Sequence, residues 1–205
     1  MESMRCIVFL VLVIITPLIC HASPDGTVLD ELNLARMHPR EYAGIVEARM
    51  QAMPGTDERC VKEAAAFLRR QRPLEALQCA PGLAASARLH VEDQGAAGSR
   101  GHRGTDGSNP WSRMARTGQW TGRQGENISY GYTDARTIVV TLIVDQGVPS
   151  RAHRRIIFCP DFTVAGAARG SHAAYGAMCV IDFAAGFAEK GEKVAMTGAW
   201  RGIDD

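Results

Sequence analysis

Two histidines and one glutamate in the polar middle of the chain carry side chains that could do chemistry. His102 follows a glycine in a segment rich in glycine and serine, Glu126 lies in a Gly-Glu-Asn-Ile sequence, and His153 lies in a Ser-Arg-Ala-His-Arg sequence. Neutral imidazole nitrogens bind zinc, and two histidines with one carboxylate leave a coordination position for water. The metal would lower the pKa of that water and Glu126 could accept its proton, so one interpretation of these residues is a metal-dependent hydrolase.

A second interpretation of the same residues stays open. His102 and His153 are far apart in the sequence, and such a pair cannot be assigned to one site from spacing as a helical His-Glu-x-x-His motif could. In this interpretation Glu126 caps a turn through backbone amides. The two histidines are then ordinary residues of a loop or a helix start.

Other chemistry-bearing residues are weaker candidates. His90 lies three residues before Asp93 on an expected helix, as part of a surface pair or as a packed core histidine. His172 lies in an expected hairpin turn, where a solvated position is the simplest interpretation. The chain has no Gly-x-Ser-x-Gly motif, which argues against a serine hydrolase of the α/β type.

Length and charge limit the class of protein. A chain of 205 residues can bury a sizeable core, and a single domain is the better interpretation. The formal net charge is +1. This balance argues against a nucleic acid or an anionic membrane as a partner held by charge.

The N-terminus has the pattern of a cleaved secretory signal. Arg5 precedes an apolar run from Ile7 to Ile19, and small residues follow it. The run is shorter than the roughly 20 residues that span a bilayer, and no second candidate follows. We therefore expect a signal peptide at residues 1–22, no transmembrane anchor, and a mature protein that is secreted, either extracellular or periplasmic.

Four cysteines follow the expected signal: Cys60, Cys79, Cys159 and Cys179. In an exported chain, four cysteines favour two disulfides, and three pairings are formally possible. Cys60 and Cys79 are close in the sequence, and so are Cys159 and Cys179. This spacing favours the pairings Cys60–Cys79 and Cys159–Cys179. Buried free thiols are the alternative.

Hydrophobic periodicity predicts helices in the first half of the chain. Two helices are expected over 28–50, joined at Pro39, and a third opens at residues 56–58 and ends before Pro73. A fourth runs from Pro81 to Gly95, and a short helix follows with Ser108 or Asn109 as its cap.

The second half of the chain has patterns typical of strands. Strands are expected at 128–132, 162–168 and 175–183, with a Gly-Ser-His turn between the last two. The β-branched run 138–144 indicates a buried strand by propensity, although residues 133–135 could start a helix there. Helices followed by strands in one chain predict an α+β fold.

A set of short motifs follows in order along the chain: Gly101-His102, Asp106-Gly107-Ser108, Arg113, Gly125-Glu126-Asn127-Ile128, and Ser150-Arg151-Ala152-His153-Arg154 with Phe158-x-Pro160-x-Phe162. Together these motifs resemble the CAP superfamily, also called the SCP-like extracellular family, in its bacterial-type branch. The resemblance covers roughly residues 28–187 and leaves 188–205 as a tail. It implies an α-β-α sandwich with an antiparallel sheet flanked by helices, and secretion. It also implies a cleft where histidines and acids converge to hold, in several members, a divalent metal.

The resemblance assigns roles to particular positions. It makes His102 and His153 the cleft histidines, Glu126 the first cleft acid and Asp145 the second, with zinc or another divalent metal as the expected cofactor. It also favours a helix over 138–144. Ala152 stands where this branch usually has glycine, and an asparagine that would tether a loop is absent.

Three functions from different classes follow. The favoured one is a secreted, non-enzymatic binding or signalling module whose partner is an unknown protein or an apolar lipid or sterol, the lipid being carried by analogy with the superfamily. The alternative is a metal-dependent hydrolase in which His102 and His153 hold the metal and Glu126 is catalytic. The third is a structural envelope protein. The chain shows no evident nucleophile or set of oxyanion donors, and this favours the binding module.

Overall fold

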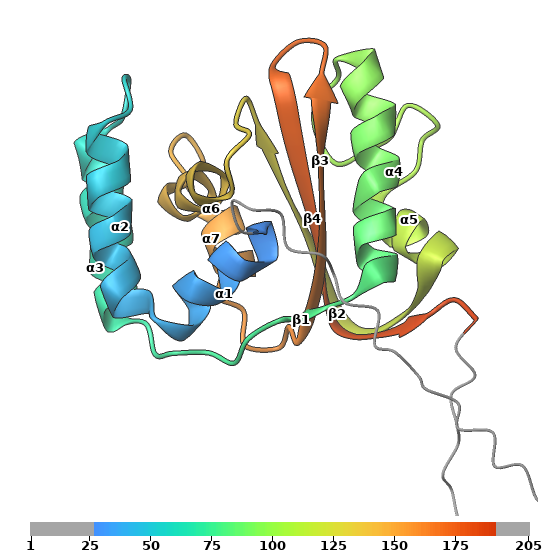
Figure 1. The fold of residues 1–205 in the computed structure, drawn as a ribbon, viewed down its shortest axis with the longest axis horizontal. Coiled ribbons are helices and arrows are strands. Elements are labelled where there is room, and N and C mark those ends of the chain that lie inside the picture. Colours follow the sequence, from blue (N-terminus) through green and yellow to red (C-terminus); the bar gives the residue numbers. More distant parts are fainter. Residues whose placement is uncertain (1–26, 192–205) are drawn as a thin grey trace, which may run out of the picture.

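The computed structural model describes residues 27–191 and shows a four-stranded sheet with helices on both faces (Figure 1). In chain order the elements are α1 (Val28–Met37), α2 (Pro39–Gln51), α3 (Glu58–Arg70), β1 (Gln78–Cys79), α4 (Pro81–Ala97), α5 (Pro110–Thr117), β2 (Gly118–Tyr130), α6 (Ala135–Val144), α7 (Ala152–Ile157), β3 (Val164–His172) and β4 (Gly176–Glu189). One face of the sheet is covered by α4 and α5, and the other by α1, α6 and α7, with α2 and α3 outside α6. The predicted α+β sandwich is confirmed.

The sheet has the strand order β1-β3-β4-β2, so β2 is an edge strand. β2 and β3 both pair with β4 in the antiparallel sense, whereas the two-residue β1 runs parallel to β3. The expected antiparallel sheet is therefore correct for its three long strands. β1 was not predicted, because two residues carry no periodicity.

The first half of the chain forms the expected helices. α1 and α2 meet at Pro39, which fits a first helical turn because its missing N–H needs no partner there. α3 begins after Asp57, whose side chain accepts the N–H of Arg59. Of the two expected caps for α5, Asn109 is the one used, in a capping box.

The β-branched run 138–144 forms a helix, as the resemblance implies and local propensity does not. Asp134 caps α6 by accepting the N–H of Thr137 at 2.8 Å. Every residue of α6 except Arg136 and Thr141 is buried. A helix enclosed by apolar neighbours on all sides does not need an amphipathic pattern, so the run resembles a buried strand.

Two strand boundaries differ from the sequence expectation. β2 begins at Gly118, ten residues before the expected strand at 128–132, and contains an irregularity between Thr121 and Gln124. Its first half is largely exposed and polar, so it lacks an alternating pattern. The expected Gly-Ser-His turn is wrong, because these residues continue β3 to His172 and the chain reverses over 173–175.

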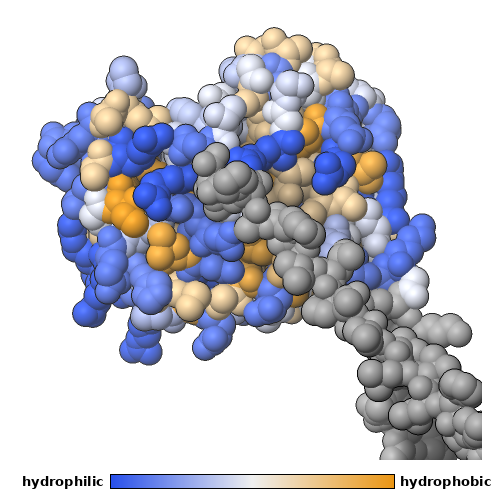
Figure 2. Space-filling model, viewed as in Figure 1, coloured by the Kyte–Doolittle hydropathy of each residue, from blue (hydrophilic) through white to orange (hydrophobic). Residues whose placement is uncertain are grey.

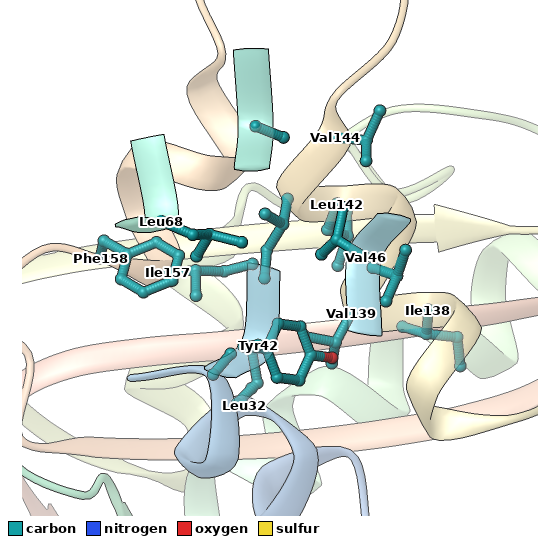
Figure 3. Close-up of a cluster of buried hydrophobic side chains, with 14 of the residues drawn as sticks. Leu32, Tyr42, Val46, Leu68, Ile138, Val139, Leu142, Val144, Ile157 and Phe158 are labelled. Carbon is teal, nitrogen blue, oxygen red and sulfur yellow. The ribbon is translucent and has the colours of Figure 1, made fainter. Parts of the chain in front are cut away.

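The main hydrophobic cluster fills the space between the sheet and the helices α1, α2, α3, α6 and α7 (Figure 3). Tyr42 is fully buried in it, and its hydroxyl donates to Glu31 Oε1 at 2.8 Å. Burial raises the pKa of this hydroxyl, and the neighbouring carboxylate raises it further. The cluster holds α6 and α7 against the sheet, so it fixes the positions of the residues at their ends.

A buried arginine joins α1 to distant parts of the chain. Arg36 is 1% exposed. Its guanidinium donates to the carbonyls of Glu75, Ile157, Cys159 and Phe162 at 2.6–3.2 Å. No charged group is among these partners, so four backbone oxygens replace the water that burial removes.

The two expected disulfides are not formed. Cys60, Cys159 and Cys179 are free thiols, and each sulfur has a different neighbour. Cys60 Sγ accepts from Arg151 at 3.6 Å, and Cys159 Sγ accepts from Arg123 at 3.8 Å. Cys179 lies in the middle of the sheet, where burial raises the pKa of its thiol to about 12. Closeness in sequence therefore did not predict the contacts of these thiols.

Hydrophilic residues cover most of the molecular face in Figure 2, and hydrophobic residues form small separate patches on it. Within residues 27–191, no helix combines the length and the apolar character needed to cross a bilayer. The expected signal peptide at residues 1–22 lies outside the described residues. The same holds for the part of the expected tail beyond residue 191.

Candidate functional site

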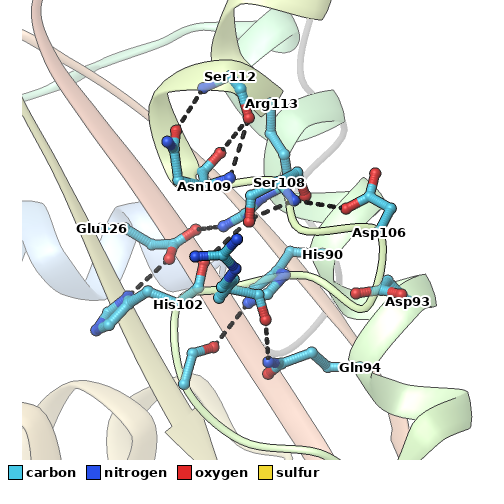
Figure 4. Close-up of polar contacts among 12 residues, drawn as sticks. His90, Asp93, Gln94, His102, Asp106, Ser108, Asn109, Ser112, Arg113 and Glu126 are labelled. Atoms are coloured by element: carbon cyan, nitrogen blue, oxygen red, sulfur yellow. Dashed lines mark hydrogen bonds and ion pairs between the residues drawn. The ribbon is translucent and has the colours of Figure 1, made fainter.

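Glu126 is the centre of a buried polar group on β2. Its side chain points to the side of the sheet that α5 covers, and the residue is 4% exposed (Figure 4). His102 Nδ1 donates to Glu126 Oε1 at 2.7 Å, and Arg113 donates to Oε2 at 2.6 Å. Burial alone would raise the pKa of Glu126, but the hydrogen bond from His102 and the charge of Arg113 outweigh it, so the pKa is lowered.

Arg113 is placed by the local structure of α5. The Asn109 cap fixes the start of this short helix, and Arg113 follows one turn later with a side chain that is 2% exposed. Besides Glu126, the guanidinium donates to the carbonyl of His102 at 3.1 Å. The same arginine therefore neutralises the acid and holds the backbone of the histidine that contacts this acid.

The loop that carries His102 is held from two sides. His90 on α4 donates from Nε2 to the carbonyl of Gly101 at 2.8 Å, and the N–H of Gly101 donates to the hydroxyl of Tyr130 at 2.9 Å. His90 is fully buried, and burial lowers its pKa. Of its two alternatives, the packed core histidine is correct. α4 itself lies very close to β3 at Gly166, where a Cβ atom would be 2.1 Å from the backbone nitrogen of Ala84.

The second histidine forms a similar pair on the other side of the sheet. α6 ends at Val144, and the residue that caps it, Asp145, adopts a left-handed conformation with φ of 54°. Asp145 Oδ1 accepts from His153 Nδ1 at 2.7 Å, and Oδ2 accepts from the backbone N–H of His153 at 2.9 Å. Asp145 thus lies beside His153.

Arginines next to His153 hold α7 in place. Arg154 is 4% exposed and donates to the carbonyls of Ile143 and Val144 at the end of α6. Arg151 and Arg154 both form ion pairs with Glu63 on α3, at 2.6 and 3.0 Å. These contacts fix the start of α7 relative to α3 and α6, and with it the histidine.

The two histidine–carboxylate pairs are joined through β2. Successive side chains of a strand point to opposite faces, so Glu126 points toward α5 and Asn127 toward α7. Asn127 is fully buried, and its Nδ2 donates to the carbonyl of His153 at 3.1 Å. One edge strand therefore carries the contact residues of both pairs.

A cleft of about 450 Å³ opens beside the second pair. Its walls come from the loop between α2 and α3, the ends of β2 and α6, and the turn between β3 and β4, and they include Met50, Met53, Arg100, Tyr130, Leu142 and His153. His102 and Glu126 do not line it. His102 is instead open to solvent, with 53% of its side chain exposed, against 25% for His153.

The arrangement decides which atoms could bind a metal. Each histidine uses Nδ1 for a carboxylate, which leaves Nε2 as the nitrogen available to a ligand, and metal-bound histidines are commonly held in this way. Glu126 and Asp145 use both of their oxygens in other contacts. Among the described residues, no group of three or more His, Cys, Asp or Glu side chains could hold a metal. Each pair therefore offers one imidazole nitrogen, with its carboxylate behind it.

Asp182 is a buried acid that the sequence analysis missed. It lies directly opposite Glu126 on β4, is fully buried, and neither of its carboxyl oxygens has a hydrogen-bond partner among the described residues. Burial raises its pKa well above the ordinary value, and the charge of Glu126 raises it further. An acid alone in the apolar run Cys-Val-Ile-Asp-Phe is the signal that could have identified it.

The sequence expectation for His172 is wrong. The residue is 2% exposed rather than solvated. Its Nε2 donates to the carbonyl of Ser99 at 2.8 Å, and its Nδ1 accepts backbone N–H groups of residues 174 and 175. It is a structural residue at the end of β3, because the strand is longer than expected.

Comparison with known proteins gives a family and a set of similar structures. The model of the cysteine-rich secretory protein family (CAP) matches residues 30–183. An outer surface protein from Borrelia burgdorferi is 18% identical with a TM-score of 0.44, over 54% of this chain and 78% of that one. An extracellular protein with an SCP domain from Bacillus anthracis is 20% identical with a TM-score of 0.44, over 54% of this chain and 34% of that one.

A cysteine-rich secretory protein from Staphylococcus aureus is 12% identical with a TM-score of 0.38, over 72% of this chain and 39% of that one. The matches to the Bacillus and Staphylococcus proteins thus span little more than a third of those proteins' length. The search of curated proteins found no match.

Proposed function

Because the chain belongs to the cysteine-rich secretory protein (CAP) family, we propose that it is an exported, non-enzymatic binding protein. In this proposal His102 and His153 bind a divalent transition metal such as zinc, and the cleft beside His153 holds a further ligand. Export rests on the signal pattern of residues 1–22 and on the family.

The metal proposal rests on one observation: each histidine ring is held by a hydrogen bond to a buried carboxylate. In each, Nδ1 is 2.7 Å from a carboxylate oxygen whose side chain is nearly fully buried, with 1% of Glu126 and 2% of Asp145 exposed. A buried acceptor of this kind fixes the ring and its tautomer and makes Nε2 a better metal ligand. Two nitrogens alone predict weaker binding than a closed site with four protein ligands.

The hydrolase alternative has less support. It needs Glu126 as a general base, and a general base works best when its pKa is near the working pH. Here the pKa of Glu126 is lowered, and its two oxygens already accept from His102 and Arg113. A bound metal would polarise a water molecule or substrate oxygen, but Glu126 would have to lose one of these partners to take the proton.

The deciding experiment is calorimetric titration of zinc into the metal-stripped mature protein at neutral pH. We expect stoichiometric binding by the wild type, binding abolished in the variant His102→Ala/His153→Ala, and wild-type binding by His38→Ala. His38 is an exposed histidine outside the site, so it reports non-specific imidazole binding. Retained binding in the double variant, or no binding by the wild type, would overturn the proposal.

A further inference from the structure

Arg100 lies at one end of the cleft, against two aromatic rings. Its guanidinium carbon is 5.5 Å from the ring centre of Tyr130 and 5.3 Å from that of Tyr175. The two tyrosine rings are 5.4 Å apart and tilted by 48°. An arginine held over aromatic faces keeps its N–H groups, which lie in the guanidinium plane, directed away from the rings.

The aromatic support of Arg100 is firmly anchored. The hydroxyl of Tyr130 accepts from the N–H of Gly101 and donates to Gln94 on α4 at 3.0 Å. His172 packs against both rings, with ring centres 5.3 and 5.1 Å away, and is itself bonded to the backbone of Ser99. This end of the sheet, where the β3–β4 turn meets the end of α4 (Figure 1), thus holds the loop of Arg100 in place without any ligand.

The charge of Arg100 is not matched by the protein. Its guanidinium, with five N–H donors, forms no hydrogen bond and no ion pair with any residue of the range 27–191. The acid that lines the same cleft is Asp145, and its oxygens are taken by His153. The cleft therefore presents one fixed cation with an open, planar set of donors.

The rest of the wall combines apolar and aromatic side chains with the polar residues Thr56, Ser129, Thr141 and Gln146. The lining includes Met50, Met53 and Leu142 together with Tyr130 and Tyr132. The volume of about 450 Å³ lies within the range of small-molecule sites. Methionine sulfur and tyrosine rings both make favourable contacts with aromatic groups. A doubly charged phosphate would call for a second cation, whereas a carboxylate matches one guanidinium in the two-bond geometry.

From these observations we propose that the cleft binds an aromatic carboxylate. Its carboxylate accepts two hydrogen bonds from Arg100, and its ring lies against the methionine and tyrosine wall. This inference rests on the proposed function, because it names the ligand class of the cleft beside His153. Binding of the carboxylate needs no metal, so an experiment can contradict the ligand class and the metal proposal separately.

The test is binding of 3-phenylpropionate to the metal-stripped mature protein, measured by calorimetry, with the neutral 3-phenylpropanamide as the matched ligand. We expect the acid to bind at least about tenfold more tightly than the amide, since loss of a charged hydrogen bond costs about 1.5–3 kcal/mol. Arg100→Gln should remove this preference, and Arg88→Gln, the same change at an exposed position of α4, should keep it.

Several results would contradict the proposed ligand class. Equal binding of acid and amide, or wild-type binding by Arg100→Gln, would overturn the proposal. Tighter binding of phenyl phosphate would replace the carboxylate by a phosphate, and tighter binding of octanoate would replace the aromatic body by an alkyl chain; either result contradicts the class proposed. If Arg100→Gln does not fold, Arg100→Lys keeps the charge without the planar donors and should weaken binding of the acid.

Zinc titration of the same variants separates this inference from the proposed function. We expect Arg100→Gln to bind zinc like the wild type while it loses the acid. Wild-type protein that binds zinc but not 3-phenylpropionate would overturn the ligand class alone. Wild-type protein that binds the acid but not zinc would overturn the metal proposal alone.

Discussion

The two histidine–carboxylate pairs have the same central hydrogen bond but different support. In both, the distance from Nδ1 to the carboxylate oxygen is 2.7 Å. The second oxygen of Glu126 accepts from the buried Arg113, a residue of another element. The second oxygen of Asp145 accepts from the backbone N–H of His153 itself. One pair is therefore stabilised by a buried charge, and the other by the local course of the chain.

The difference shows two ways to fix an imidazole ring. The Glu126 pair depends on β2, α5 and the loop of His102 coming together, so it is sensitive to any change that leaves a buried charge alone. The Asp145 pair lies within one short segment between α6 and α7. There the left-handed conformation of Asp145 turns its carboxylate back toward the start of α7.

The largest expected effect is on the charged pair. Arg113→Met would leave Glu126 buried without its cation, and we expect unfolding free energy to fall by about 3–5 kcal/mol, measured by urea unfolding at neutral pH. Arg116→Met on the same helix removes an exposed ion pair with Asp106 and should change stability far less. Similar losses in the two variants would contradict an extra cost of leaving Glu126 buried without its cation.

A smaller effect is expected at the Asp145–His153 pair, and it should appear in metal binding. Asp145→Asn keeps the side-chain shape and suits the left-handed conformation, but it removes the negative charge behind His153. We expect zinc affinity to fall about 10- to 100-fold by calorimetry, with only a modest loss of stability. Asp161→Asn, at an exposed position, is the matched control. Unchanged zinc affinity in Asp145→Asn would mean that the carboxylate does not assist this histidine.

The cross-strand acids Glu126 and Asp182 should respond to pH in opposite directions. The pKa of Glu126 is lowered from 4.5, so its contribution to stability is full above that value and is lost as pH falls through the folded-state pKa. The pKa of Asp182 is raised above 3.8, so stability is greatest below that value and declines as pH rises through the folded-state pKa.

Urea unfolding between about pH 3 and about pH 7 measures both acids. We expect Asp182→Asn to remove the decline toward neutral pH and Glu126→Gln to remove the decline toward acid, with about 1.4 kcal/mol for each unit of pKa shift. A stability profile of Asp182→Asn that parallels the wild type would contradict a protonated Asp182 in the folded protein.

The smallest expected effect concerns the hydrogen bond from Asn127 on β2 to the backbone of His153. Asn127→Ala removes the hydrogen bond to the carbonyl of His153 and should cost about 1 kcal/mol in unfolding free energy. The nitrogen NMR signals of His153 should shift while those of His102 stay in place. Ser129→Ala, on the same strand and also buried, is the control. A shift of the His102 signals of equal size would mean that β2 couples the pairs as a whole.

The features predicted correctly from sequence were those with local causes. Pro39 between two periodic segments, Asp57 before α3, and Asn109 before Pro110 all act on neighbouring backbone groups, so their effect can be seen without the fold. The site residues came from a resemblance carried by short motifs. That resemblance named Asp145 as the second cleft acid, but it did not predict the hydrogen bonds between Asp145 and His153.

The missed features depend on surroundings that no local pattern records. The start of β2 is polar because it is an exposed edge, and α6 lacks an amphipathic pattern because it is enclosed. His172 and Asp182 are polar residues buried by tertiary packing. The cysteines were paired by their closeness in sequence, whereas the sulfurs of Cys60 and Cys159 each contact an arginine.

The buried Arg36 also constrains the order in which the chain can reach its final state. Its four carbonyl partners lie at residues 75 and 157–162. Until that late segment has been synthesised and folded back, the guanidinium of α1 must stay in water, because burial without these acceptors is costly. Contacts between such distant positions slow folding. The burial of Arg36 is thus completed only after this segment has folded, and a chain that stops before residue 157 cannot bury Arg36 in this way.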